Sequence, residues 1–300
     1  MSAALAVEKI NLVRIAHVYY KHKDTRKVQE FLCDFGFLEV KRVNDKVYYR
    51  GYSSEPFIYC LEQSDKDEFG GAAFVVESEQ DLERATQTLP GATEIYTLDD
   101  APGGGRCMTF RDPVDNCPFH LVYGQHPAPD QKTFPEPKFN YPTDKQRPAN
   151  QSQRFKKGPA LVHRLGHFGL CVTDFPKMYE FYTTHFNFIP SELVHDESGT
   201  DITTFLRLDR GTELVDHHCF FFFPGPKFHV HHSSFETHDF DTQVLGHDWL
   251  RHQGFDPSRF ILEHYVDGDL VDSSQPVNRQ PASPDNLHVW GPDLPPTFLQ

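Results

Sequence analysis

The feature that most constrains this chain is a fourfold repeat whose last copy is short. Four times an apolar strand leads into an amphipathic helix, and after the first three helices further strands follow. In the first helix Val28, Phe31, Leu32 and Phe35 fall on one face at the spacing of a helical stripe. This order predicts βαβββ modules in pairs. The strand and helix pairs that open the four modules are expected at 14–20 with 25–35, 71–78 with 79–89, 164–174 with 175–186, and 227–237 with 241–253.

The modules predict an α+β fold with two barrel-like domains. Modules one and two give an N-terminal domain at 1–124, and modules three and four give a C-terminal domain at 161–268. Residues 125–160 between them are rich in Pro and polar residues without periodicity, which is typical of a linker. Residues 269–300 form a Pro-rich tail in which no regular structure is expected, packed through Trp290 and Phe298.

The fourth module is about 17 residues shorter than the second. From Gly71 to Phe119 is 48 positions, and from the corresponding His232 to Glu263 is 31. The difference equals about two strands and a turn. Three explanations stay open: natural divergence, replacement of a strand by the tail, and loss of an internal block at the 254–255 junction through a splicing or gene-model error.

Composition indicates which kinds of partner the chain can bind and in which compartment it is expected. A net charge of -14 argues against nucleic acid, because phosphate binding needs clustered Lys and Arg. The N-terminus lacks the pattern of a secretory signal, and no apolar stretch approaches the length of a membrane span. The six cysteines are scattered without a CxxC pair, which favours reduced thiols in a cytoplasmic protein.

Residues suited to a metal lie in the opening and closing strands of the C-terminal half. His167 lies in LGHFGL, and alternation leaves His231 and His232 open as candidates in HVHHSSFE. Glu263 lies in the apolar strand FILEHYVD, where a carboxylate facing a core costs several kcal/mol unless a cation or strong donors neutralise it. One such His is more often a core or surface residue. Two imidazoles and a carboxylate from three strands, however, are typical of the facial triad that binds Fe(II).

At these residues the chain resembles a known family. GHFGL, HHSSF and DPSRFILEHYVDGDL, within doubled βαβββ modules, are similar to the type I extradiol ring-cleavage dioxygenases of the vicinal oxygen chelate superfamily, which also contains glyoxalase I. The most similar members are fungal catechol 2,3-dioxygenase-like proteins. The resemblance implies the vicinal oxygen chelate fold and three metal ligands: His167, His232 (the histidine directly before SSF) and Glu263.

The resemblance implies that the N-terminal half binds no metal. His17 matches the first ligand position, but Gly71 stands at the second and Phe119, or its neighbour His120, at the third. One imidazole cannot hold Fe(II), so this half is predicted to be a scaffold.

Further site residues are expected beside the triad. The family has an acid/base histidine on the strand HHCFFFF; His218 is our choice and His217 the alternate, and an imidazole suits the role because its pKa lies near neutrality. Tyr265 shares the side of Glu263 and either contacts the ligand or packs. Phe220 and Phe222 either wall an aromatic pocket or belong to the core.

Two departures from the family count against a working enzyme. The family carries another catalytic His and a Tyr on the two strands that the fourth module lacks. Arg259 also replaces the Gly of a D-P-x-G turn, where a positive φ would strain a non-Gly residue.

The function that follows is extradiol cleavage of a catechol by O2 at Fe(II), with Mn(II) as the alternative metal, in a cytoplasmic homo-oligomer. Two other functions stay open. One is a non-catalytic protein that binds metal or an aromatic ligand through an eroded last module. The other is another metalloenzyme of the glyoxalase fold.

Overall fold

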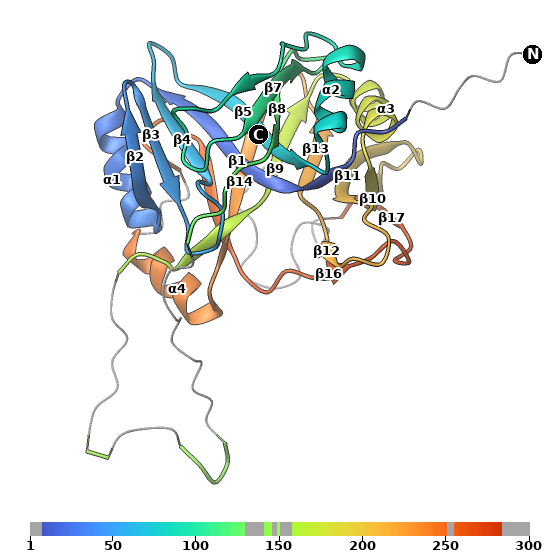
Figure 1. Cartoon of the computed structure of the whole chain (residues 1–300). Helices are drawn as coiled ribbons and strands as arrows, with labels where there is room; N and C mark the ends of the chain where they lie inside the picture. Colours follow the sequence, from blue (N-terminus) through green and yellow to red (C-terminus); the bar gives the residue numbers. More distant parts are fainter. Residues whose placement is uncertain (1–7, 130–140, 146–148, 151–157, 251–254, 284–300) are drawn as a thin grey trace, which may run out of the picture.

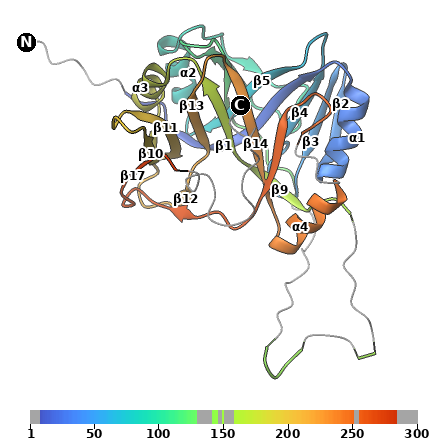
Figure 2. The same cartoon turned by 180° about the vertical axis from the view of Figure 1, so that it is seen from behind.

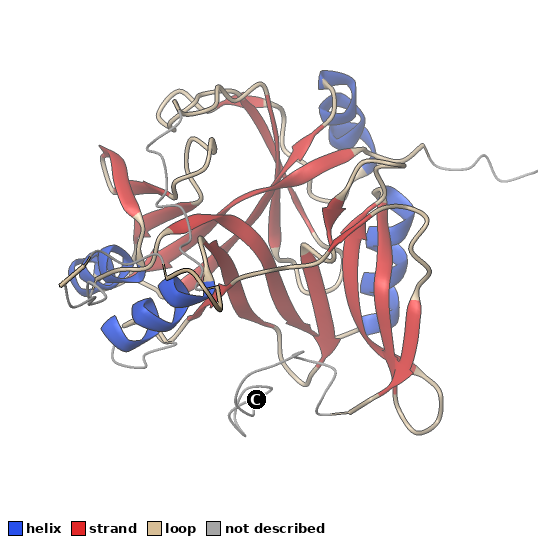
Figure 3. Cartoon of the chain, turned by 90° about the horizontal axis from the view of Figure 1, so that it is seen from below, coloured by secondary structure: helices blue, strands red, loops and turns tan. Residues whose placement is uncertain are grey.

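The computed structural model describes residues 8–129, 141–145, 149–150, 158–250 and 255–283. Its elements follow the predicted repeat: each module opens with a strand that leads into a helix (Figure 1). Figure 3 shows the helices at the periphery of the sheets. The expected α+β fold of paired modules is confirmed.

The four helices lie close to their predicted positions. Helices α1 and α3 begin after the N-cap residues Asp24 and Asp174, and α2 begins after Ser78; each cap side chain accepts a hydrogen bond from a backbone N–H of the first turn. The predicted stripe of α1 is buried. The helices are α1 (Thr25–Phe35), α2 (Glu79–Thr88), α3 (Phe175–His185) and α4 (Phe240–Trp249).

The first two modules form one eight-stranded sheet in the order β2-β3-β4-β1-β5-β8-β7-β6. The opening strands of the two modules, β1 and β5, pair antiparallel at its centre. The strands are β1 (Leu12–His22), β2 (Leu38–Val43), β3 (Lys46–Arg50), β4 (Tyr59–Gln63), β5 (Glu68–Val76), β6 (Tyr96–Thr97), β7 (Arg106–Arg111) and β8 (Pro118–Tyr123).

The last two modules form a seven-stranded sheet in the order β15-β14-β9-β13-β11-β10-β17. Here the opening strands β9 and β14 pair antiparallel, as β1 and β5 do. A separate pair joins β12 to β16. The strands are β9 (Val162–Val172), β10 (Phe188–His195), β11 (Asp201–Leu208), β12 (Val215–Asp216), β13 (Phe220–Pro224), β14 (His229–Thr237), β15 (Ile261–Tyr265), β16 (Leu270–Val271) and β17 (Asn278–Pro281).

The core runs through both halves, because the first module packs on the fourth and the second on the third. Phe35 and Phe37 of the first module contact Phe235 of the fourth, with ring centroids 5.8 and 4.7 Å apart. Phe119 of the second contacts Tyr182 of the third at 5.2 Å. Helices α1 and α4 accordingly lie side by side at one end of the molecule, and α2 and α3 both lie toward the other end (Figures 1 and 2).

The shortened fourth module lacks two strands in the part of the chain that the structure describes. In the second module β6 and β7 follow α2, and β7 pairs with β8. Between α4 and β15 the described residues carry only an isolated bridge from Phe255 to Ile261, so β15 ends its sheet. The 254–255 junction lies partly outside the described residues, since residue 254 is not among them.

The tail corrects one expectation. Short strands β16 and β17 lie in the region where no regular structure was predicted, and they pair with β12 and β10. Strands of two to four residues are held by backbone pairing and show no readable alternation. Trp290 and Phe298 lie outside the described residues. The domain boundaries at 124, 160 and 268 stay predictions, and no helix in the described ranges is long and apolar enough to cross a membrane.

Candidate metal centre

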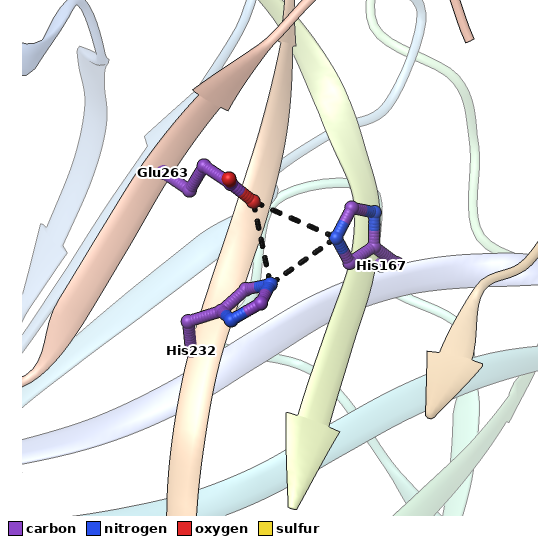
Figure 4. Close-up of side chains that lie close together, drawn as sticks. All are labelled: His167, His232 and Glu263. Atoms are coloured by element: carbon purple, nitrogen blue, oxygen red, sulfur yellow. Dashed lines mark hydrogen bonds and ion pairs between the residues drawn. The ribbon is translucent and has the colours of Figure 1, made fainter. Parts of the chain in front are cut away.

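The side chains of His167, His232 and Glu263 converge from β9, β14 and β15 (Figure 4). The Nε2 atoms of His167 and His232 lie 3.2 Å apart. Glu263 Oε2 lies 3.7 Å from Nε2 of His167 and 3.3 Å from Nε2 of His232. A cation about 2.1 Å from three donors at right angles would hold them about 3 Å apart. The spacing of the three donors therefore fits one divalent ion.

Strand register brings these residues together. His167 is paired with Ser234 across β9 and β14, and Ser234 is paired with Glu263 across β14 and β15. His232 lies two residues before Ser234 on the same strand, so its side chain points to the same face. Of the two adjacent histidines, the structure brings His232, and not His231, to the other two.

The electrostatics suit a cation. Burial, only partly offset by Glu263, lowers the pKa of His232 to about 3. Burial raises the pKa of Glu263, but the attraction of His232 and the hydrogen bond from His167 outweigh it and lower this pKa to about 2. At neutral pH the site therefore offers a neutral imidazole and a carboxylate, the protonation states in which these groups bind metals.

The neighbouring His231 supports the orientation of His232. Its Nδ1 lies 2.8 Å from Nδ1 of His232, so one ring nitrogen of His232 is held and Nε2 is left to face the triad. A hydrogen bond at the second nitrogen is typical of metal-binding histidines.

The other expected residues lie around this centre. The His218 ring lies 4.3 Å from that of His167, and burial, followed by repulsion from His167, keeps the pKa of His218 well below its ordinary value. His217 lies farther out, with Nδ1 3.3 Å from Nδ1 of His218 and Nε2 3.6 Å from Glu192. The Tyr265 ring lies 5.4 Å from that of His167, and burial raises its pKa. A side chain at Gly166 would overlap Tyr265.

The expected aromatic wall is displaced by one residue. Phe220 and Phe222 are fully buried in the main core, which confirms the second of their two expected roles and excludes the first. Phe221 faces the site instead, 5.0 Å from the His232 ring and stacked on Phe205 at 5.4 Å. In a run of four Phe residues, alternation alone does not show which two of them face the site. The pairing of Phe221 with Gly169 decides between them, because only Gly leaves room for its ring.

The N-terminal half repeats the geometry with an incomplete donor set, because Gly71 stands at the second position. Across β1 and β5, His17 pairs with Ala73, and Ala73 pairs with His120 on β8; hence His120, and not Phe119, stands at the position of Glu263. Both nitrogens of His120 are engaged, by Thr109 and by the backbone of Gly70. The Tyr19 hydroxyl lies 3.0 Å from Nε2 of His17. Within the described residues the C-terminal triad is the only cluster of three potential ligands.

The structure adds site neighbours that the sequence did not indicate. Phe221 lies beside His232 of the triad, Phe205 contacts His218, and Glu192 approaches His217. The first module also brings Tyr20 and His22 against the fourth. The sequence did contain a signal for Tyr20 and His22. Both are polar, whereas the third module has apolar Leu170 and Val172 at the same repeat positions.

Residues 164–268 match the family described as the Glyoxalase/Bleomycin resistance protein/Dioxygenase superfamily. The match covers the third and fourth modules, which carry the candidate metal centre. The resemblance to fungal members of that superfamily stays a prediction. A sequence comparison with curated proteins finds no match.

Solved structures share the fold of this chain over nearly its whole length. A Mn(II)-bound glyoxalase from Novosphingobium aromaticivorans is 19% identical with a TM-score of 0.75, covering 96% of this chain and 94% of its own. Homoprotocatechuate 2,3-dioxygenase from Arthrobacter globiformis is 18% identical with a TM-score of 0.72, covering 94% and 88%. The enzyme from Brevibacterium fuscum, in complex with 3,4-dihydroxyphenylacetate, is 17% identical with a TM-score of 0.76, covering 99% and 93%. At these identities the likeness establishes the vicinal oxygen chelate fold.

Proposed function

We propose that the chain is an Fe(II)-dependent extradiol dioxygenase that cleaves a catecholic ring with O2. The observation that carries the proposal is the convergence of His167, His232 and Glu263 at distances that suit one divalent ion. A ferrous ion at such a triad supplies adjacent open positions for both reactants and a path for electrons between them. Mn(II) accepts the same donors and is the alternative metal.

The surrounding side chains suit an aromatic diol. The Phe221 ring lies beside His232, and Phe205 stacks on Phe221 and contacts His218, so aromatic side chains wall the site, as an aromatic ligand would require. His218 is buried and neutral, so it can accept a proton from a substrate hydroxyl and return it as the ring opens. Tyr265 closes the side of His167. Both oxygen atoms of O2 enter the product, a muconic semialdehyde.

We also propose that the protein is a homo-oligomer of the cytoplasm. The six cysteines are unpaired, which suits the reducing cytoplasm. A homo-oligomer is expected from the family resemblance.

The test is oxygen uptake after anaerobic loading with Fe(II) and a panel of catechols. We expect O2 consumption and a yellow ring-opened product, with both abolished by His232→Ala. The matched control is His229→Ala on the same strand, whose imidazole contacts the backbone of Lys227 and which should retain turnover. Turnover that survives His232→Ala would contradict the assignment of this residue.

One observation favours a second function. Glu263 has a side chain 40% exposed, against 12% and 7% for His167 and His232, and its strand lacks an equivalent of β7 in the described part of the chain. An open wall admits water, which favours a member that binds metal or an aromatic ligand without turnover. Metal binding without O2 consumption across the catechol panel would support this function over the first.

A further inference from the structure

Strand β1 directs two buried polar side chains, Tyr20 and His22, at the fourth module. Neither side chain is exposed. The first module lacks a metal site of its own, and both residues lie on the face that packs against β14 and the turn before β15.

Tyr20 contacts the strand that carries the second candidate ligand. Its hydroxyl lies 2.8 Å from Oγ of Ser233, and both residues are fully buried. Ser233 stands between His232 and Ser234, and its side chain points to the opposite face of β14. This hydrogen bond therefore fixes β14 at the point where His232 faces the triad.

His22 contacts the turn that leads to the third candidate ligand. Its Nε2 lies 2.8 Å from the Tyr59 hydroxyl and its Nδ1 lies 2.9 Å from Oγ of Ser258, which in turn donates to Asp67 at 2.8 Å. Because the Ser258 hydroxyl hydrogen is used on Asp67, Nδ1 of His22 donates to Ser258 and Nε2 accepts from Tyr59. Each hydrogen bond in this series therefore has a defined donor and a defined acceptor. The series fixes Ser258 in the turn, five residues before Glu263.

The fourth module needs this support from outside its own sheet. In the second module β8 is held on both sides, by β5 and by β7. Among the described residues β15 pairs with the strand β14 on one side and has no second strand beside it. Its other contacts are the Phe255 bridge, a hydrogen bond from Gln243 Nε2 to the His264 carbonyl, and the His264 ring beside the Phe35 carbonyl of the first module. A strand with one neighbour is free to shift unless other contacts hold it.

The repeat provides an internal comparison. At the positions equivalent to Tyr20 and His22 of the first module, the third module has Leu170 and Val172. At the positions equivalent to Ser233 and Ser258 of the fourth module, the second module has Ala72 and Val114. Apolar side chains therefore satisfy the packing of this interface, and burying polar groups adds a desolvation cost. The polar set occurs only beside the module that carries the triad.

We propose that Tyr20 and His22 are positioning residues for the metal centre, holding β14 and the turn before β15 so that His232 and Glu263 reach one ion. The inference rests on the proposed metal site. In addition to its role as a scaffold, the N-terminal half then holds the strand that carries one of the ligands and the turn that leads to another.

The test measures Mn(II) binding to the full chain by the electron paramagnetic resonance of free and bound Mn(II). Tyr20→Phe and Ser233→Ala each remove one side of a hydrogen bond and keep the fold. We expect each to weaken Mn(II) binding about tenfold and to broaden the bound spectrum, with the double variant no weaker than either single. Tyr49→Phe is the matched control, because that buried hydroxyl has no hydrogen-bond partner among the described residues.

The outcomes separate the inference from the proposed function. Wild-type affinity in Tyr20→Phe, with only a lower unfolding temperature, assigns a merely structural role and overturns the inference. Losses that add in the double variant also overturn it. If the unaltered chain binds no Mn(II), the proposed metal site fails first and the inference fails with it.

Discussion

At the scale of single residues, Arg259 is the clearest departure from what the local backbone favours. Its φ is 74°, in the left-handed region, as its place in a D-P-x-G-like turn predicts. The equivalent turn of the second module places Asn116 there with φ 60°, and Asn tolerates this region. The guanidinium lies 4.3 Å above the Phe255 ring, a contact that offsets part of the strain.

Arg259→Gly should therefore stabilise the chain. Relief of the left-handed strain contributes about 1 kcal/mol to the free energy of unfolding, and loss of the exposed ring contact removes about half of that. Chemical denaturation of the metal-free protein measures the difference. Arg26→Gly is the control, since this exposed position within α1 should lose about 1 kcal/mol. An Arg259→Gly chain less stable than the parent would contradict the strain argument.

At the scale of elements, the helices were predictable and the shortest strands were not. The stripe of α1 is a local signal, and the predicted bounds of α1, α2 and α3 agree with the structure within one residue. The fourth helix was predicted at 241–253 and ends earlier, at Trp249. The faces of β13 and the pairings of β12, β16 and β17 depend on neighbours distant in sequence. Phe221 faces the site because Gly169 lies beside it on another strand, and no alternation within FFFF contains that information.

The candidate site was predictable for a related reason. His167 and His232 open equivalent modules and Glu263 closes the last, so the repeat itself aligned them. The repeat did not settle whether Phe119 or His120 corresponds to Glu263, because the turn before β8 is one residue longer than the turn before β15. Only the pairing of Ala73 with His120 resolved it.

The turn before β15 should make stability depend on pH. Asp256 is buried, one carboxylate oxygen has no hydrogen-bond partner among the described residues, and burial raises its pKa from 3.8 to about 6. A raised folded-state pKa favours the neutral form, so its stabilising effect is complete below the unfolded pKa and is lost as pH rises through 6. From about pH 4 to pH 7.5 the parent should lose roughly 2.5 kcal/mol relative to Asp256→Asn. Unfolding free energies of both chains across this range give the difference, and a constant difference would contradict the buried-carboxylate argument.

At the scale of the whole molecule, the two halves are related by the repeat but differ at the equivalent position. One half has three potential ligands there, while the other has Tyr19 beside His17 and the hydrogen-bonded His120. The sequence indicates this difference through Gly71, which stands where the other half has His232. It did not predict that the first module packs on the fourth, because the contacts between Phe35 and Phe235 cross more than half the chain.

That packing predicts that the C-terminal half cannot form the site alone. In a fragment of residues 158–300, Phe235 loses Phe35 and Phe37, Ser233 loses Tyr20, and Phe220 loses Phe119. Exposing one buried aromatic side chain costs about 1.5–3 kcal/mol, so exposing about five of them costs roughly 8–15 kcal/mol, as much as the 5–15 kcal/mol that typically holds a domain folded. The isolated fragment should show no cooperative unfolding and no Mn(II) binding, and coexpression with residues 1–124 should restore both. Calorimetry and Mn(II) titration of the fragment, the coexpressed pair and the full chain test this. A fragment that folds alone and binds Mn(II) as tightly as the full chain would show that the shared core is dispensable and that the modules of each sheet form an independent domain.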